Sequence, residues 1–293
     1  MTAGPVWEAG EKTHRDENFP VASFLVSKRH RAPIMAFYRF ARAADDVADD
    51  PNLSEDEKVF TLDAFEATLL GQTDAIAHAV PLRAALAERG LSPQHAQDLL
   101  IAFRRDARQT RYTDWDDIMD YCRYSAMPVG RFVLDVHGES RDTWPANDAL
   151  CAALQINNHL QDCGADYRRL DRVYIPLDQL EGRGIAVEAL AARKASPALL
   201  EVIHHLAAKT EALLGSAQLS HGIRDTRLSL EVAGIERLAR KIVHLLKERD
   251  PLSERVHLSK TASASNLIAA AGLELGRRLF APVTAQPALR GGK

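Results

Sequence analysis

Apolar residues recur along most of the chain at spacings of three and four, and the strict alternation typical of half-buried strands is almost absent. This spacing places apolar side chains on one face of a helix. The Ala- and Leu-rich windows predict helices near residues 20–28, 33–49, 54–70, 75–89, 92–109, 114–137, 146–166, 195–219, 225–248 and 261–280. The chain is therefore predicted to be all-α.

The ends of these helices carry ordinary signals, such as a capping box formed by Ser54 and Glu57 and a terminating Gly138. Residues 167–195 mix Pro176 and two glycines with basic and aromatic residues, which predicts a loop with one short helix. The length of 293 residues fits one compact domain with room for a large cavity. We expect a domain at 17–281 between flexible tails at 1–16 and 282–293.

Composition narrows the functional classes. A net charge of -3 with 26% charged residues gives no basic surface of the kind that binds nucleic acid. No long uncharged apolar window and no apolar signal core are present, so we expect a cytoplasmic protein with transient contact at the inner membrane surface. Cys122, Cys151 and Cys163 occur singly, which predicts reduced thiols in packed positions.

An acid run, ARAADDVADD at residues 41–50, ends the helix predicted at 33–49. At 100° per residue, one stripe of that helix contains Tyr38, Arg42, Asp45, Asp46 and Asp49. Neighbouring carboxylates repel each other on a helix, and acids at a helix C-terminus also oppose its dipole. The run therefore either ends a helix in solvent or belongs to a site that supplies a cation.

A second polar stripe lies on the mainly apolar helix predicted at 146–166. Asn158, Asp162 and Asp166 recur every four residues, and Gln155 extends the same face. Buried polar groups need partners, so a polar stripe on such a helix favours an internal hydrated cavity. A helix with one solvent-exposed face would show the same pattern.

The oxygen ligands of the two stripes suit Mg²⁺, which takes few protein carboxylates and completes its shell with water and phosphate oxygens. Zinc is disfavoured because His159 and Cys163 point off the second stripe. The ligand set implies a diphosphate, which arginine can contact in bidentate geometry. The candidate arginines, each alone more typical of a surface charge, are Arg42, Arg168, Arg169, Arg172 and Arg255.

Three ordered segments resemble motifs of the squalene and phytoene synthase family. YRFARAADDVADD from Tyr38 and NHLQDCGADYRRLDRVYIP from Asn158 resemble its two aspartate-rich motifs, and YCRYSAMPVGRFVL from Tyr121 resembles the helix break that lines its isoprenoid tunnel. The resemblance runs from about Asn18 to Phe280. It implies a single-domain isoprenoid synthase fold, with helices around a central active-site cavity.

The resemblance also implies roles for individual residues. Two or three Mg²⁺ ions would bridge the substrate diphosphate to Asp45, Asp49, Asn158, Asp162 and Asp166. Asp46 would assist, while Asp50 only ends the helix. The diphosphate-binding residues would be Arg42, Arg172 and Arg255, and the catalytic residues Tyr38, Tyr121, Tyr174 and Asn158. The tyrosines would stabilise a carbocation, as Phe37 and Phe132 could, and Asn158, Ser125 or a tyrosine hydroxyl would position a water.

Within the family, the segments PVGRFVLDVHGE and NHLQDCGADYRRLDRVYIP are most similar to the bacterial hopanoid branch. The implied reaction is Mg²⁺-dependent ionisation and rearrangement of presqualene diphosphate, with water capture to give hydroxysqualene and diphosphate. The implied pathway partners make presqualene diphosphate and reduce hydroxysqualene. The alternatives are a head-to-head condensing prenyltransferase making presqualene diphosphate, squalene or phytoene, and a non-catalytic helical assembly protein.

Three departures from the condensing members bear on this choice. Asn18 stands where they usually carry Ser, the spacing from Asp166 to Arg172 is one residue longer than in many of them, and Leu238 replaces a tyrosine near the end of the cavity. These differences favour a subtype that acts on a preformed C30 diphosphate.

Overall fold

The computed structural model describes residues 26–280, and within that range the all-α prediction is confirmed. The only extended pairing among these residues is an isolated bridge between Arg111 and Val173. The expected tails at 1–16 and 282–293 and the altered position Asn18 lie outside the described residues. The helices are α1 (Lys28–Asp49), α2 (Glu55–Leu69), α3 (Val80–Arg89), α4 (Gln94–Asp106), α5 (Trp115–Ser125), α6 (Met127–His137), α7 (Trp144–Leu170), α8 (Leu177–Glu181), α9 (Pro197–Ser216), α10 (Leu219–Gly222), α11 (Thr226–Leu246) and α12 (Lys260–Phe280).

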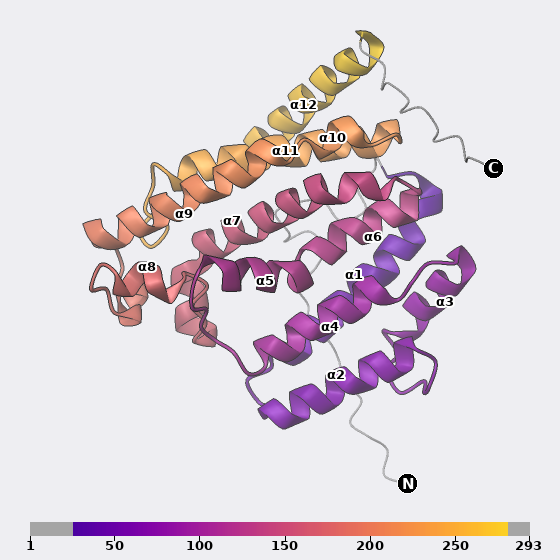
Figure 1. Cartoon of the computed structure of the whole chain (residues 1–293), viewed down its shortest axis with the longest axis horizontal. Helices are drawn as coiled ribbons and strands as arrows, with labels where there is room; N and C mark the ends of the chain where they lie inside the picture. The colour runs from indigo at the N-terminus through magenta and orange to yellow at the C-terminus, as the bar shows by residue number, and fades with distance from the viewer. Residues whose placement is uncertain (1–25, 281–293) are drawn as a thin grey trace, which may run out of the picture.

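The long helix α7 runs through the middle of the molecule (Figure 1). It packs against α9 and α11 on one side and against α5 and α6 on the other. Helix α1 packs on α2, α3, α4 and α6, and α12 lies along α11. The apolar residues of α7 explain its central place, because Leu150, Ala153, Ile156 and Leu160 are all buried. The two helices that carry the acid stripes thus belong to two packed groups joined by α6.

The start of α1 corrects the predicted boundaries. The helix predicted at 20–28 lies mostly outside the described residues, and the next helix begins at Lys28, five residues before the expected start at Pro33. Pro33 lacks the N–H that would donate to the carbonyl of Arg29. The guanidinium of Arg89, at the end of α3, donates to that carbonyl instead. A tertiary contact therefore lets the helix continue through the proline.

The single helix that periodicity predicted at 114–137 was wrong, because the chain breaks at Ala126 into α5 and α6. The break lies within residues 121–134, the segment that resembles a helix break of the family. Ala126 has φ -120° and ψ -48°, outside the helical range. Pro128 explains the break, since its ring clashes with the carbonyl four residues earlier and its nitrogen cannot donate. Gly138 ends α6 with φ 69°, as the sequence predicted.

The region 167–195 was only partly predicted. Helix α7 continues to Leu170, four residues past the expected end, and the expected single short helix is instead α8 followed by a 3₁₀ turn at Val187–Ala191. The four extra residues place the second acid stripe inside a continuous helix.

The chain reverses after α7 at Asp171, whose φ of 50° lies in the left-handed region. It then runs beside the segment that follows α4, where the Val173 N–H donates to the Thr110 carbonyl at 2.9 Å. This pairing fixes the two flanking residues, Arg172 and Tyr174, against the end of α4.

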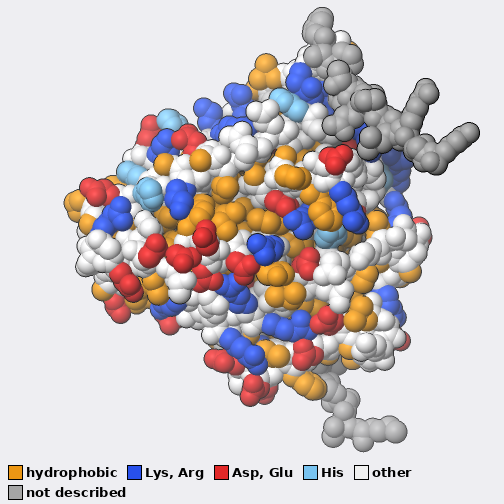
Figure 2. Space-filling model, in the orientation of Figure 1, with side chains coloured by type: hydrophobic (Ala, Val, Ile, Leu, Met, Phe, Trp, Pro, Cys, Tyr) orange, Lys and Arg blue, Asp and Glu red, His pale blue; other side chains and the backbone are white. Residues whose placement is uncertain are grey.

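The charge distribution on the surface and the three cysteines can be compared with what the sequence predicted. Charged side chains of both signs are mixed over the face shown in Figure 2. No helix within residues 26–280 is long and apolar enough to cross a membrane. Cys122, Cys151 and Cys163 are unpaired, and Cys122 and Cys163 are buried, as predicted.

Gly130 tests how tightly α6 packs on α7. A Cβ added there would lie 2.0 Å from Asn147 Oδ1 and 2.6 Å from Cys151 Sγ. We therefore expect Gly130→Ala to lower the free energy of unfolding by about 1–3 kcal/mol through overpacking, measured by denaturant titration. The control is Gly272→Ala in α12, where no atom lies within 4 Å and a small gain from helix propensity is expected. Equal stability of the two variants would contradict the packing described.

Candidate active site

A cavity of about 350 Å³ separates α1 from α7 and α11. Its lining is predominantly apolar and comes from α1, α6, α7, α10 and α11. Phe37 of α1 and Phe132 of α6 stack at its wall, with ring centroids 4.1 Å apart. Tyr38 also lines it, one helical turn before Arg42. The first stripe thus runs from the apolar cavity, at Tyr38, to the acids.

The acids of α1 are held by the arginine of their own stripe. Arg42 contacts Asp45 at 2.8 Å and Asp46 at 3.0 Å. The side chain of Asp45 keeps 33% of its surface exposed. Burial, reinforced by the charge of Asp49, raises the pKa of Asp45 to about 7. Arg42 therefore pairs with two acids of its stripe, Asp45 and Asp46.

Arg172 joins α1 to the end of α4. Its Nη1 lies 2.5 Å from Asp49 Oδ1, and its Nη2 donates to the Asp106 carbonyl at 3.2 Å. Only 7% of Arg172 is exposed. An arginine buried to this degree requires anionic partners. The chain reversal at Asp171 and the Val173 bridge put the guanidinium in this position.

Asp106 is a site residue that sequence reasoning missed. Its carboxylate is buried and accepts a hydrogen bond from the Tyr121 hydroxyl at 2.9 Å, while burial raises its pKa to about 7. A signal was present, because Asp106 follows Leu99, Ala102 and Phe103 at spacings of seven, four and three. An acid on the apolar face of a helix indicates a buried polar contact.

A group of aromatic rings lies next to Arg172. Tyr174 stacks on His159 with centroids 3.5 Å apart, and it lies 5.7 Å from Tyr121 and 5.5 Å from Tyr112. The sequence placed Tyr121 and Tyr174 in the site but missed Tyr112 and His159. Burial raises the pKa of Tyr121 and Tyr174 well above their usual range, so both hydroxyls stay protonated.

His159 lies off the polar stripe of Asn158, Asp162 and Asp166, as the helical spacing indicated, but it faces the aromatic rings. Burial, reinforced by the charge of Arg172, lowers the pKa of His159 to about 3, so the imidazole is neutral at physiological pH. Its Nε2 lies 3.1 Å from the Gln155 amide. Together with the tyrosines it forms a wall of neutral rings beside the acids.

The second stripe faces the same charged region. Burial raises the pKa of Asp166 to about 7, and the charges of Asp162 and Asp49 act in the same direction. Asp162 is exposed and Asn158 is half-buried on the same helix face. The acids of α1 and α7 therefore share one electrostatic environment, as predicted from their stripes.

Arg255 is the predicted site residue least connected to this region. Its side chain is exposed, and within residues 26–280 no ion pair joins it to either stripe. Gln161, next to Asp162, nevertheless donates to the carbonyl of Val256. The segment that carries Arg255 is thus held against α7, and its contact with phosphate stays a prediction.

The donor set fits Mg²⁺, because the candidate ligands are hard carboxylate and amide oxygens. Burial raises the pKa values of Asp45 and Asp166, and the neighbouring carboxylates of Asp49 and Asp162 act in the same direction. Within the described residues, these acids do not form a group of three ligand atoms within 4.8 Å, as a closed protein cage would. The acids could therefore hold ions that share their remaining positions with water and phosphate.

Similarity to known proteins agrees with this geometry. The family model described as squalene/phytoene synthase matches residues 12–262. The chain belongs to the squalene/phytoene synthase family. Two hydroxysqualene synthases are 56% (Rhodopseudomonas palustris) and 55% (Sinorhizobium fredii) identical to it over 281 residues, 96% of each chain. The prediction of an enzyme of this type is confirmed.

Solved structures of the squalene/phytoene synthase family share the fold. Squalene synthase HpnC from Alicyclobacillus acidocaldarius is 29% identical, with a TM-score of 0.70 over 80% of this chain and 90% of its own. The predicted isoprenoid synthase fold is thereby confirmed. Enzymes of this kind generally use divalent metal ions, which agrees with the carboxylate oxygens of the two acid stripes.

Asp106 predicts a pH dependence of stability. Its pKa is about 7 in the folded protein and near 4 when unfolded, so between these values the folded state holds a proton that the unfolded state lacks. Stability should therefore fall as pH rises from about 4 to 7. Asp106→Asn removes the titrating carboxyl group. The loss of folding stability between pH 4 and 7 should therefore be smaller in this variant, by on the order of 1–3 kcal/mol.

The measurement is denaturant titration of chelator-treated protein across that pH range. Asp116→Asn, at an exposed position on α5, is the matched control. The same pH slope in wild type and Asp106→Asn would show that the Asp106 carboxyl titrates as if it were in water.

Proposed function

We propose that this protein converts presqualene diphosphate and water into hydroxysqualene and diphosphate, in a Mg²⁺-dependent reaction. The observation that carries the proposal is the similarity of 55–56% over 96% of the chain to hydroxysqualene synthases. The geometry supports it, because two acid stripes flank an arginine-bridged region beside an apolar cavity.

The ionisation step breaks the carbon–oxygen bond to the diphosphate, which leaves with the bonding electron pair. Bound Mg²⁺ supplies charge neutralisation for this leaving group. The residues that would hold it are Asp45, Asp49, Asn158, Asp162 and Asp166. Arg42 and Arg172 already lie among the acids and could turn toward phosphate oxygens as those acids engage metal.

The carbocation left behind needs surroundings that neither trap it early nor carry a competing positive charge. Tyr38 lies at the cavity wall, and Tyr121 and Tyr174 lie in the ring cluster, where their π-faces could stabilise a cation. The neutral His159 adds no positive charge to that cluster. The rearranged cation then bonds to a water oxygen, and one proton is released; Asn158 or a tyrosine hydroxyl would position that water.

A second function stays possible because the family also contains condensing enzymes. A phytoene synthase from Pseudescherichia vulneris is 29% identical over 305 residues, 98% of each chain. Head-to-head condensation of two prenyl diphosphates is therefore the alternative. The assay below separates the two. The first proposal also includes pathway partners, one that supplies presqualene diphosphate and one that reduces hydroxysqualene. It further includes a cytoplasmic location with transient membrane contact.

The deciding experiment supplies purified protein and Mg²⁺ with presqualene diphosphate in one arm, and with farnesyl or geranylgeranyl diphosphate in the others. Lipid extracts are analysed by mass spectrometry. Hydroxysqualene from the first arm, with one oxygen from labelled water, is the expected result. Unchanged presqualene diphosphate together with product from a prenyl diphosphate arm would replace the proposal with the condensing alternative.

The acid stripes can be tested separately. Asp45→Ala and Asp162→Ala should each lower kcat/KM by at least about 10²-fold, because each removes charge that holds Mg²⁺ against the leaving group. Asp50→Asn is the matched control within the same acid run and should retain activity within a few fold. Helical circular dichroism checks folding. Near-normal activity of folded Asp45→Ala and Asp162→Ala would remove the metal assignment.

A further inference from the structure

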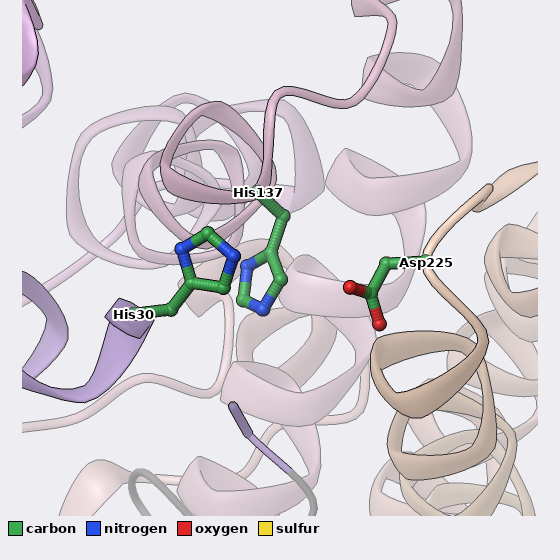
Figure 3. Close-up of side chains that lie close together, drawn as sticks. All are labelled: His30, His137 and Asp225. Atoms are coloured by element: carbon green, nitrogen blue, oxygen red, sulfur yellow. The ribbon is translucent and has the colours of Figure 1, made fainter. Parts of the chain in front are cut away.

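A second group of ligand-type side chains lies away from the acid stripes, where α1 and α11 begin and α6 ends. One ring nitrogen each of His30 and His137 and one carboxylate oxygen of Asp225 all lie within 4.8 Å of one another. Figure 3 shows the two imidazole rings side by side, with the Asp225 carboxylate reaching toward them from the α11 side. The ring centroids are 4.2 Å apart.

Hydrogen bonds fix where each ring carries its lone pair. His137 Nδ1 lies 2.8 Å from the Val133 carbonyl oxygen, so Nδ1 carries the proton and Nε2 the lone pair. Arg29 Nε donates to His30 Nε2 at 2.9 Å, which requires the lone pair of His30 at Nε2 as well. For His137, whose Nδ1 donates to a carbonyl, this is the usual arrangement of a metal ligand.

His30 is fixed in the interior of the molecule. It is 4% exposed, its ring packs against His137, and the Arg29 side chain donates to its Nε2.

Two hydrogen bonds fix Asp225 in place. The Asp225 backbone N–H donates to Glu139 Oε1 at 2.7 Å. The Asp225 carboxylate is the N-cap of α11, where its Oδ1 accepts from the Leu228 N–H at 3.0 Å. Beside the histidines, a cavity of about 300 Å³ is lined in part by Arg29, Arg89 and Asp135. This cavity provides a path for an ion and its waters.

We propose that His30, His137 and Asp225 bind one divalent transition-metal ion, Zn²⁺ in particular, at a site separate from the acid stripes. Two imidazole nitrogens and one carboxylate oxygen are a ligand set typical of Zn²⁺, with water in the fourth tetrahedral position. Mg²⁺, which prefers oxygen ligands in octahedral geometry, fits this set poorly. The ion takes the lone pair of His30 that Arg29 now occupies, and the Arg29 side chain turns into the adjacent cavity.

Metal binding at this site would stabilise the helices that line the apolar cavity. The three helices that supply its ligands also supply cavity-lining residues, including Phe37 from α1, Phe132 from α6 and Val232 from α11. An ion bound only in the folded state ties these three helices together and stabilises that state. The expected role is structural, so metal uptake can be measured without substrate.

The test uses the full chain, stripped with chelator and then saturated with Mg²⁺ so that the acid stripes are occupied. Zn²⁺ binding is measured by calorimetry, and Co²⁺ serves as a visible-absorption probe of coordination geometry. Wild type should take up one Zn²⁺ with a rise in Tm of about 2 °C or more at saturation. His137→Ala and Asp225→Asn should each weaken Zn²⁺ affinity by about tenfold or more, and the tetrahedral Co²⁺ spectrum should disappear.

Asp225→Asn keeps an acceptor at the N-cap of α11, so this variant should fold even where His137→Ala does not. His221→Ala, at an exposed histidine on α10, and Asp162→Asn on the acid stripe are the controls, and neither should change Zn²⁺ affinity under these conditions. The proposal is overturned if folded wild type takes up no Zn²⁺. It is equally overturned if wild type and folded Asp225→Asn bind Zn²⁺ with the same affinity and the same Co²⁺ spectrum.

Discussion

Negative charge is concentrated between α1 and α7, and the two arginines that offset it constrain the surrounding structure. Asp45, Asp106 and Asp166 all have pKa values raised to about 7 because the fold buries them beside other acids. Arg42 stays on its own stripe, whereas the buried Arg172 bridges Asp49 and the end of α4. Such clustering lowers stability, and in natural proteins it is typical of functional sites. In the proposed function, a bound metal ion would offset the negative charge of these acids.

The fold separates this charged region from an apolar one. Helix α1 contributes to both, because Phe37 and Tyr38 line the cavity while Asp45 and Asp49 lie about two and three turns later. Helix α7 has the same division, with Leu150 and Leu154 at the cavity and Asp162 and Asp166 toward its C-terminal end. A substrate with a charged head and a long apolar chain would match both regions at once.

Short tertiary contacts set the positions of the residues that matter most. The chain reversal at Asp171 and the pairing of Val173 with Thr110 bring Arg172 to Asp49, 123 residues away in sequence. The Arg89 guanidinium supports the first turns of α1 across Pro33. The neighbouring histidine, His30, lies in that same supported turn. The reversal at Asp171 and the proline in α1 are thus the points where contacts from distant parts of the chain position these side chains.

The sequence alone determined the helical class, most helix positions and the two polar stripes, because helical periodicity is a local property that spacing reveals. It also predicted Tyr121 and Tyr174 as site residues through their motifs, and their rings lie 5.7 Å apart. Only the tertiary structure decided that α1 continues through Pro33 and that Asp106, Tyr112 and His159 lie beside the predicted site residues. Only the tertiary structure likewise brings His30, His137 and Asp225 together. Each of these depends on groups far apart in sequence, and spacing along one helix carries no information about which distant side chain will satisfy a carbonyl, an acid or a ring.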